Sequence, residues 1–477
     1  MPDLRRQIFE SGKTVSRKAA SREASRTNSH ASSKQTSRQS SRAASRQPSD
    51  DEDAGYLSDE TAMSIGSLDD ENPEQDNADW PVELAERIHE LLDRKRSSVQ
   101  GREEALTAFC RLTKYHFAED VTRVFAGELL IAFCKSVRTE SSVLETTQAL
   151  RAIELLAITT NDDKTYENTE SLLTRTIRDS TSSAVKAAAI HCLGACTVFG
   201  GAGEDGILDQ MTFLLDVVAS DGQSIDAPDD ATTVTAALQV WGFLATEIDD
   251  FEADSEEAAQ IFIDQLDSGD SSVQVAAGEN LALLYEKSYT PQEDGESNEE
   301  EDSEESDEHE NIDNGPKLVK RYNAYHNTPE LERQLKALAH VHTKRISKRD
   351  KKSLHSNFAS ILNTIENPRR GPRYNTAIDQ DTNRHYGSTL TVKIGKHGIM
   401  SIDRWWKWVR LTALRRILQG GFAEHYFQGN RAVLDNLPVM LRAAGRSGDR
   451  ESAKKAAKMR NNHSSRRWTA PQSDDED

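Results

Sequence analysis

The sequence predicts an all-α protein: an armadillo/HEAT-like α-solenoid, preceded by a disordered N-terminal arm and followed by a small, mainly helical C-terminal domain with a β-hairpin. Two observations predict this. A short pattern, two small or hydroxyl residues and then a valine, returns ahead of five alanine- and leucine-rich runs, at Val99, Val143, Val185, Val234 and Val273. The valines are 44, 42, 49 and 39 residues apart, which is close to the roughly 40–47 residues of armadillo and HEAT repeats. Hydrophobic residues make up only 36% of the chain, so we expect unfolded stretches beside the repeats.

The repeated pattern has the chemistry of a helix start. A serine or threonine side chain at a helix N-terminus accepts a hydrogen bond from a backbone N–H that has no partner within the helix. We expect the valine and the alanines after it to face the neighbouring repeat. One unit cannot bury its apolar face alone, so the units in residues 80–289 must stack. The alternative is an irregular helical domain in which the pattern arose by chance.

Residues 1–79 are predicted to form a disordered arm that is first basic and then acidic. Residues 1–49 hold 11 Lys/Arg and 3 acids, with repeated Ser-Arg pairs, whereas residues 50–79 hold 12 acids and no base. Burial of so few apolar groups cannot offset the entropy of ordering such a chain. The basic part is either an arm for RNA or an acidic protein face, tuned by phosphorylation, or a solvated tail. Tyr56 and Leu57, set among carboxylates, belong either to a linker or to a short docking peptide.

The array begins with a helix near Pro81, a residue suited to the first helical position, with Leu84, Ile88 and Leu91 on one face. Its second half is strongly acidic, because residues 187–286 contain 20 acids and neither Lys nor Arg. Such a surface either attracts a basic partner, the chain's own basic segments included, or forms a solvated outer face.

Residues 290–316, with 13 acids and no base, are predicted to be a disordered acidic insert. Residues 317–373 are predicted to be a basic helical segment that continues the array. One helix starts at Thr328-Pro329-Glu330, where we expect Thr328 to cap the helix and Pro329 to take its first position. A second helix carries Phe358, Ile361 and Ile365 on its apolar face. Six cations lie where the two helices meet, and they are called the junction cluster below: Lys344, Arg345, Lys348, Arg349, Lys351 and Lys352. They are candidates for contacts with RNA phosphates, the alternative being a solvated face.

Residues 374–445 form the predicted C-terminal domain. Weak alternation in residues 389–394 and again in residues 399–401 indicates a β-hairpin. Asp403 then opens a helix in which Trp405, Trp406 and Trp408 are interleaved with cations, either as core or as a platform for bases. Residues 446–477 are a predicted basic tail with an acidic end. Its cations, called the tail cluster below, are further candidates for phosphate contacts: Lys454, Lys455, Lys458, Arg460, Arg466 and Arg467.

The sequence contains no arrangement of residues that indicates catalysis. His191, Cys192 and Cys196 have ligand-like spacing but lack a fourth partner, so we expect core residues rather than a zinc site. The GxGxxG match in residues 201–206 follows a helix and carries two carboxylates, which argues against phosphate binding. No stretch is apolar enough to span a membrane, and four cysteines fit a reducing compartment. We expect no enzymatic activity, cofactor, bound metal, small-molecule substrate or membrane partner.

Three stretches resemble the interferon-related developmental regulator family. The first is AAGENLALLYE at residues 276–286, which is similar to the end of the family's helical array. The second is residues 335–366, where a basic cluster precedes a helix that contains Phe358. The third is the C-terminal part, with LTVKIG at residues 390–395, IDRW at residues 402–405 and LPVML at residues 437–441. The Ser-Arg arm departs from the family, and residues 451–467 match its C-terminal basic helix only loosely.

The resemblance implies a non-enzymatic regulator. Family members are associated with binding translationally inactive ribosomes, where the basic C-terminal segment lies in the mRNA channel. Animal members are also associated with transcriptional co-regulation through co-repressor complexes. We therefore expect a protein that binds ribosomes or ribosomal RNA through its basic C-terminal segments and represses or stores idle translation machinery. The alternative is a nuclear scaffold for co-repressor or chromatin proteins, which would contact its acidic solenoid. The expected location is the cytoplasm, alone or together with the nucleus.

Overall fold

The computed structural model describes residues 79–94, 97–292, 318–340, 348–379, 384–388, 390–394, 398–438 and 442–443. All of them belong to one compact unit, residues 55–477. The predicted arm up to residue 78, residues 293–316 of the predicted acidic insert, residue 317 and the predicted tail from residue 446 lie outside the described residues. The domain boundaries expected from the sequence therefore stay a prediction.

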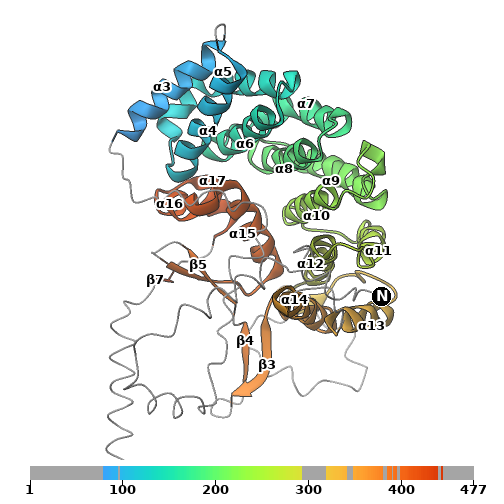
Figure 1. Ribbon diagram of the computed structural model, residues 1–477. Coiled ribbons are helices and arrows are strands. Elements are labelled where there is room, and N and C mark those ends of the chain that lie inside the picture. The colour runs from blue at the N-terminus through green and yellow to red at the C-terminus, as the bar shows by residue number, and fades with distance from the viewer. Residues whose placement is uncertain are drawn as a thin grey trace, which may run out of the picture. The chain divides into compact units, whose positions relative to one another are not determined.

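The described helices follow one another as pairs, as the solenoid prediction requires (Figure 1). The first helices of the pairs are α3 (Trp80–Leu92), α5 (Glu119–Thr139), α7 (Thr165–Asp179), α9 (Gly203–Ala219), α11 (Ser255–Gln265) and α13 (Thr328–Ala339). The second helices are α4 (Val99–Tyr115), α6 (Val143–Thr160), α8 (Ser183–Phe199), α10 (Ala231–Ala245), α12 (Ser271–Lys287) and α14 (Lys348–Glu366). A short 3₁₀ turn, η3 (Gln223–Ile225), precedes α10. Each second helix packs on the next, from α4 through α14, so their apolar faces form one continuous core. The predicted fold class is confirmed.

The repeated pattern marks the start of the second helix of a pair. Ser98 and Ser142 accept hydrogen bonds of 3.0 Å from the backbone N–H groups of Gly101 and Glu145, as predicted. The capping prediction is wrong for α10 and α12, where the aspartates just before the pattern, Asp230 and Asp270, accept the bonds instead. It also fails at α8, which has no side-chain cap. Thr328 is likewise the first residue of α13 rather than its cap.

The valines of the pattern do not all face a neighbouring repeat. Val185, Val234 and Val273 are buried, but Val99 and Val143 are 38% and 49% exposed. The reason is helical register: Val99 and Val143 are the first residues of their helices, whereas the other valines are the third or fourth. Two residues turn a helix by about 200°, so a valine at the first position and a valine at the third position face different sides of the helix. The prediction is wrong for the first two pattern-bearing helices.

Short strands connect the later elements. The strands β5 (Thr391–Ile394) and β6 (Gly398–Ser401) form the predicted antiparallel hairpin, with Val392 opposite Met400, and β7 (Arg442–Ala443) adds to β6. The strands β1 (Tyr289–Pro291) and β2 (Leu318–Lys320) pair with each other, so the first two residues of the predicted acidic insert, 290 and 291, belong to a strand. A third pair, β3 (Tyr374–Asp379) with β4 (Arg384–Ser388), was not foreseen.

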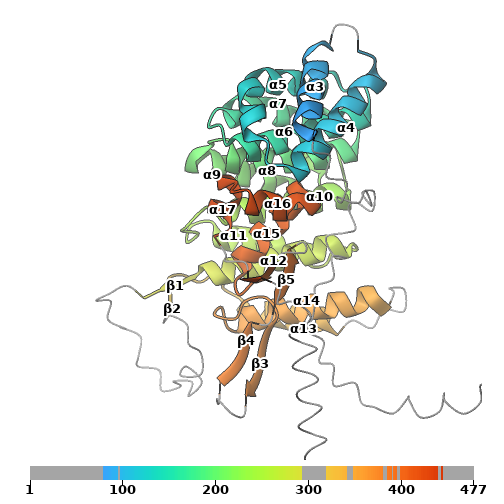
Figure 2. The same cartoon turned by 90° about the vertical axis from the view of Figure 1, so that its left-hand side faces the viewer.

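The last helices return along the array rather than extending it. They are α15 (Trp405–Leu418), the 3₁₀ turn η5 (Gln419–Gly421), α16 (Phe422–Phe427) and α17 (Arg431–Asn436). Helix α15 packs on α12, α10 and α6, α16 packs on α4, and α17 packs on α6, so the chain lies across the second helices (Figures 1 and 2). Among the described helices, none combines the length and apolarity needed to cross a membrane.

Candidate functional site

The surface made by α4, α6, α10 and α12, called the second-helix face, is covered by residues 405–436, called the docked segment. Trp405 is 3% exposed, and Trp406 and Trp408 pack against the core. The interpretation of these tryptophans as core residues is therefore confirmed. The contacts that hold the docked segment show which charged side chains form ion pairs and hydrogen bonds within the chain.

Two carboxylates of α12 hold the start of α15. Glu286 accepts hydrogen bonds from the backbone N–H groups of Trp405 and Trp406, at 2.8 and 3.1 Å. Its negative charge lies at the positive end of the helix dipole, where it replaces a missing local cap. Glu279, two turns earlier, accepts from the indole N–H of Trp408 at 3.0 Å. Burial raises the pKa of both carboxyl groups, and that of Glu279 to about 7.

Two arginines fix the middle and the end of α15. Arg410 lies 2.8 Å from the Glu247 carboxylate, and its guanidinium donates to both the hydroxyl and the carbonyl oxygen of Thr246. Arg416 lies 3.0 Å from Glu154, which is only 3% exposed. A basic segment of the chain thus docks on acidic residues of the array. This was one of the alternatives that the sequence left open for the acidic surface. These two arginines are already engaged in ion pairs within the chain.

The far end of the docked segment is fixed by neutral polar groups. His425 is fully buried, and its Nε2–H donates to the carbonyl of Thr113 at 3.0 Å. Its Nδ1 accepts from the Asn430 amide, which also donates to the carbonyl of Ile158. With one ring nitrogen donating and the other accepting, the imidazole is neutral. Burial lowers the pKa of His425 to about 4. At Gly421, an added Cβ would lie 1.8 Å from the carbonyl oxygen of Lys114.

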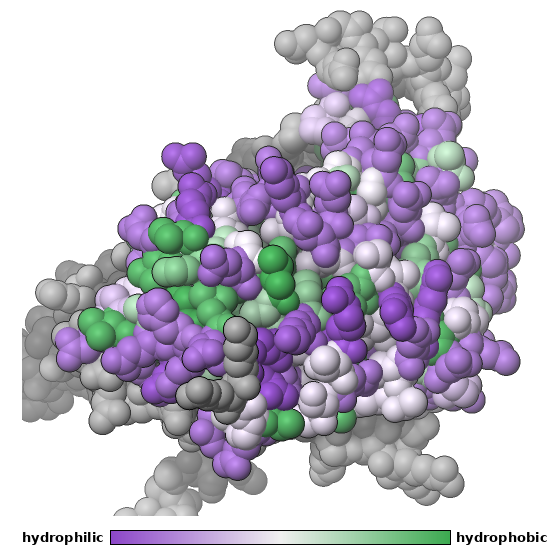
Figure 3. Space-filling view, turned by 90° about the horizontal axis from the view of Figure 1, so that it is seen from above, coloured by the Kyte–Doolittle hydropathy of each residue, from purple (hydrophilic) through white to green (hydrophobic). Residues whose placement is uncertain are grey.

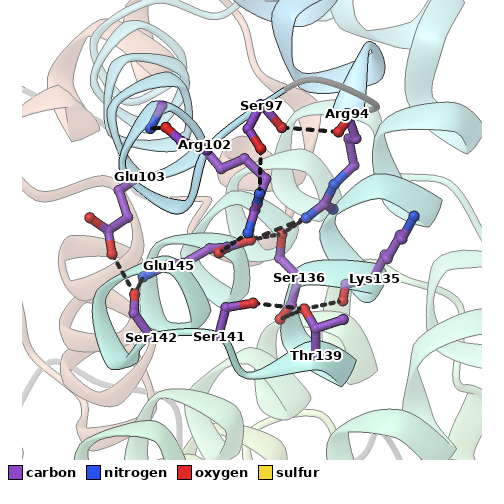
Figure 4. A network of polar contacts seen from close by, with 12 residues as sticks. Arg94, Ser97, Arg102, Glu103, Lys135, Ser136, Thr139, Ser141, Ser142 and Glu145 are labelled. Atoms are coloured by element: carbon purple, nitrogen blue, oxygen red, sulfur yellow. Dashed lines mark hydrogen bonds and ion pairs between the residues drawn. The ribbon is translucent and has the colours of Figure 1, made fainter.

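A second charged group, at the other end of the array, is structural. Glu145 is fully buried and accepts from Arg94, Arg102 and Ser136, at 3.1, 2.7 and 2.8 Å (Figure 4). It occupies the third position of α6, where α8 and α12 carry a valine. Burial acts to raise its pKa, but the hydrogen bonds from Arg102 and Ser136, together with the charges of Arg102 and Arg94, outweigh burial and leave the pKa below its usual value. This network joins α4, α5, α6 and the connection between α3 and α4.

A family model described as interferon-related developmental regulator (IFRD) matches residues 21–366, which end at the last residue of α14. The chain belongs to the interferon-related developmental regulator family. It is also 26% identical over 368 residues to an uncharacterized protein of Schizosaccharomyces pombe, an alignment that covers 76% of each chain. In this family member, the run at residues 276–286 supplies both carboxylates that hold α15.

The structure describes only some of the predicted phosphate-binding residues of this IFRD protein. Lys348, Arg349, Lys351 and Lys352 lie at the start of α14, where the structure describes the backbone and not their side chains. Lys344, Arg345 and the whole tail cluster lie outside the described residues. Helix α14 is firmly seated on α12: Phe358 and Ile361 are buried, and a Cβ added at Gly278 would come within 2.7 Å of Ile361 Cδ1.

No catalytic or metal-binding arrangement emerges from the described part of the chain. Within it, no group of three or more His, Cys, Asp or Glu side chains is placed to hold a metal ion. Cys192 and Cys196 are fully buried in α8, and burial holds the pKa of Cys192 well above its usual value, as expected of core thiols. The GxGxxG match is a turn at Gly201 that leads into the first turn of α9, rather than a loop throughout.

Sequence reasoning missed the roles of Glu279 and Glu286. A signal was present, because the two carboxylates are seven residues apart, on one face of an otherwise apolar helical run. Paired carboxylates in such a position need partners, since burying an unpaired charge is costly. What the sequence alone did not reveal was that the partners come from a helix more than a hundred residues later.

Proposed function

We propose that this protein is a non-enzymatic helical-repeat protein that binds ribosomes through ribosomal RNA phosphates and so represses or stores idle translation machinery. The observation that carries the proposal is the start of α14. Lys348, Arg349, Lys351 and Lys352 occupy its first five residues with a single acid, Asp350. Cations at this end oppose the helix dipole and weaken the isolated helix. At a helix N-terminus the first N–H groups have no partner within the helix, and the dipole is positive there. Both act together with the cationic charge, and the combination favours a bound phosphate.

The docked segment supports this assignment by elimination. Arg410 and Arg416 are held by Glu247 and Glu154, so they serve the fold. The junction cluster, the tail cluster and the basic arm of residues 1–49 remain as dense groups of cations that are candidates for contact with a polyanion. The tail cluster follows β7 in the chain, and β7 pairs with β6. The point from which the tail continues is therefore tied to the sheet formed by β5, β6 and β7.

The test is sedimentation of the full-length protein through sucrose gradients of a low-salt lysate, from growing and from starved cells. We expect co-migration with ribosomes, lost when the six tail-cluster cations are changed to Glu. A junction-cluster variant with six matching changes is expected to weaken co-migration as well. The control changes six cations of the basic arm to Glu: Arg17, Lys18, Arg22, Arg26, Arg38 and Arg42. It alters the net charge equally and is expected to keep the interaction.

Two outcomes would contradict the proposal. One is sedimentation as a free protein under both growth conditions. The other is an equal loss in all three variants, because that would show dependence on net charge rather than on the two clusters. Circular dichroism of each variant separates loss of contact from loss of fold, which matters for the junction cluster because α14 packs on α12.

A second candidate function is a nuclear scaffold that binds basic co-repressor or chromatin proteins. The observation that favours it is the acidic outer surface around α9 and α11, where Asp209, Asp216, Asp249, Glu252, Glu257 and Asp264 are exposed. Neutralising these six with Asn or Gln is expected to abolish binding to a basic partner and leave ribosome binding intact. Strictly cytoplasmic location in imaging would exclude this function.

A further inference from the structure

The outward face of α5 carries an apolar stripe that the fold does not use. Val124 and Ile131 are 75% and 72% exposed, and Gly127 between them is open, with nothing within 4 Å of an added Cβ. Residues 124, 127 and 131 share one side of a helix, because three or four residues make one turn. Seen from above, apolar side chains gather toward the side where α3 and α5 lie in Figure 1 (Figure 3).

The neighbouring first helix shows what a solvated face looks like in this array. The exposed residues of α7 are all polar: Glu167, Asn168, Ser171, Arg175, Arg178 and Asp179. Like α7, helix α5 ends in exposed cations. Beyond Ile131, the same face continues with the exposed cations Lys135 and Arg138. Asp120 is exposed at its start, and Glu128 is exposed between Gly127 and Ile131. The stripe thus combines two large apolar side chains and one acid in the middle of α5 with two cations at its C-terminal end.

A nearby segment of the chain has the complementary chemistry. Residues 56–68 hold five large apolar residues, Tyr56, Leu57, Met63, Ile65 and Leu68, within a stretch of 12 acids and no base at residues 50–79. Apolar side chains match Val124 and Ile131, and carboxylates match Lys135 and Arg138. Residues 80–186 hold 15 of the 16 bases of residues 80–289, beside 17 acids, so this acidic segment is attached to the end of the array that carries its cations.

The geometry of the attachment allows the contact. The Trp80 ring stacks on His116 at 4.4 Å, and α5 begins at Glu119. The chain therefore enters α3 beside the start of α5. The eleven residues from Asp69 to Asp79 span up to about 36 Å when extended. That reach exceeds the length of α5, about 32 Å for its 21 residues.

We propose that residues 56–68 dock in cis on the outward stripe of α5, with their apolar side chains on Val124 and Ile131 and their carboxylates toward Lys135 and Arg138. A short tether gives such a segment an effective concentration in the millimolar range, so a modest contact is enough. Docking covers an apolar surface near the exposed end of the solenoid, where an uncovered repeat lowers solubility. It also fixes where the basic arm, residues 1–49, leaves the array.

The test places a photo-crosslinking benzoylphenylalanine at position 131 of the full-length protein. We expect a crosslink to residues 56–68 within the same chain, with a yield that does not change over a wide range of protein concentration. The matched control carries the crosslinker at Arg175 on α7, a side chain that is 74% exposed, and is expected to give no crosslink to this segment. Because both positions are exposed, neither change disturbs the core.

Two further variants test the chemistry. Leu57→Ser, Ile65→Ser and Leu68→Ser together keep every charge and are expected to lower the crosslink yield about tenfold, the factor for a loss of about 1.4 kcal/mol. Lys135→Glu with Arg138→Glu is expected to lower it as well. Crosslinks between chains that increase with concentration would overturn the proposal in favour of a second copy. Absence of crosslinks to residues 56–68, or a yield unchanged in the serine variant, would overturn it outright. None of these readouts involves ribosomes.

Discussion

The carboxylate of Glu286 provides the sharpest test of how the docked segment is held. It accepts from two backbone N–H groups at the start of α15, and Trp405, the nearer donor, is 3% exposed. Glu286→Ala leaves both donors without an acceptor. A buried donor that loses its partner costs about 1–3 kcal/mol, so the pair is worth about 3 kcal/mol. Because the helix has no local side-chain cap, we expect most of this cost to fall on the docked segment.

The measurement is hydrogen exchange of the α15 amides in the native full-length protein. A loss of about 3 kcal/mol lowers their protection roughly 100-fold, while the amides of α6 and α8 keep theirs. Glu286→Gln, which keeps one acceptor oxygen, is expected to fall between. The control is Glu257→Ala at an exposed site of α11, with an effect within about 0.5 kcal/mol. Unchanged protection of α15 in the alanine variant would refute the reasoning.

Three further predictions concern the same interface. Arg416→Met leaves the Glu154 carboxylate, which is 3% exposed, without its partner. We expect the free energy of unfolding, measured by chemical denaturation, to fall by about 3–5 kcal/mol, and Glu154→Gln added to this variant to restore most of that loss. An Arg416→Met variant as stable as the wild type would contradict the role of the pair. Gly421→Ala forces a Cβ against the carbonyl of Lys114. We expect it to destabilise the docked segment by more than about 1–3 kcal/mol, the usual cost of overpacking. The measurement is the rate of proteolysis of the docked segment, which should increase. The pKa of His425 is about 4 in the folded protein against 6.5 as its ordinary value. The unfolded chain therefore takes up the proton first, and stability that is complete above pH 6.5 falls by about 3 kcal/mol toward pH 4. A His425→Gln variant whose acid sensitivity equals that of the wild type would contradict this.

Much of the array follows from the sequence, because its units are local. The starts of the second helices, the apolar faces of α3 and α14 and the β5–β6 hairpin depend on residues close in the chain. The prediction that failed concerned helical register, the position at which the pattern valine stands in its helix. The same Ser-Ser-Val letters place valine first in α6 and third in α12. Only the position of the cap, Ser142 in one case and Asp270 in the other, distinguishes the two.

The docked segment was only partly foreseeable. Three tryptophans in one short helix predicted burial, and the acidic array predicted attraction to the chain's own cations. Neither observation identifies which helices meet, because contacts such as Arg416 with Glu154 join residues far apart in the sequence. The β3–β4 hairpin was missed for another reason: its strands, YNTAID and RHYGS, lack apolar alternation, and Ile378 and Tyr386 are exposed. The proposed roles of the junction and tail clusters remain predictions.

The measurement that tests the proposed function most directly is the affinity of the purified full-length protein for purified ribosomes as a function of salt. Contacts to about six phosphates of single-stranded RNA give a slope of log K against log salt near −4. The account predicts a steep slope of this order, and a markedly shallower one when the tail cluster is changed to Glu. Binding with little salt dependence, the same slope in the variant, or no binding at low salt would contradict it.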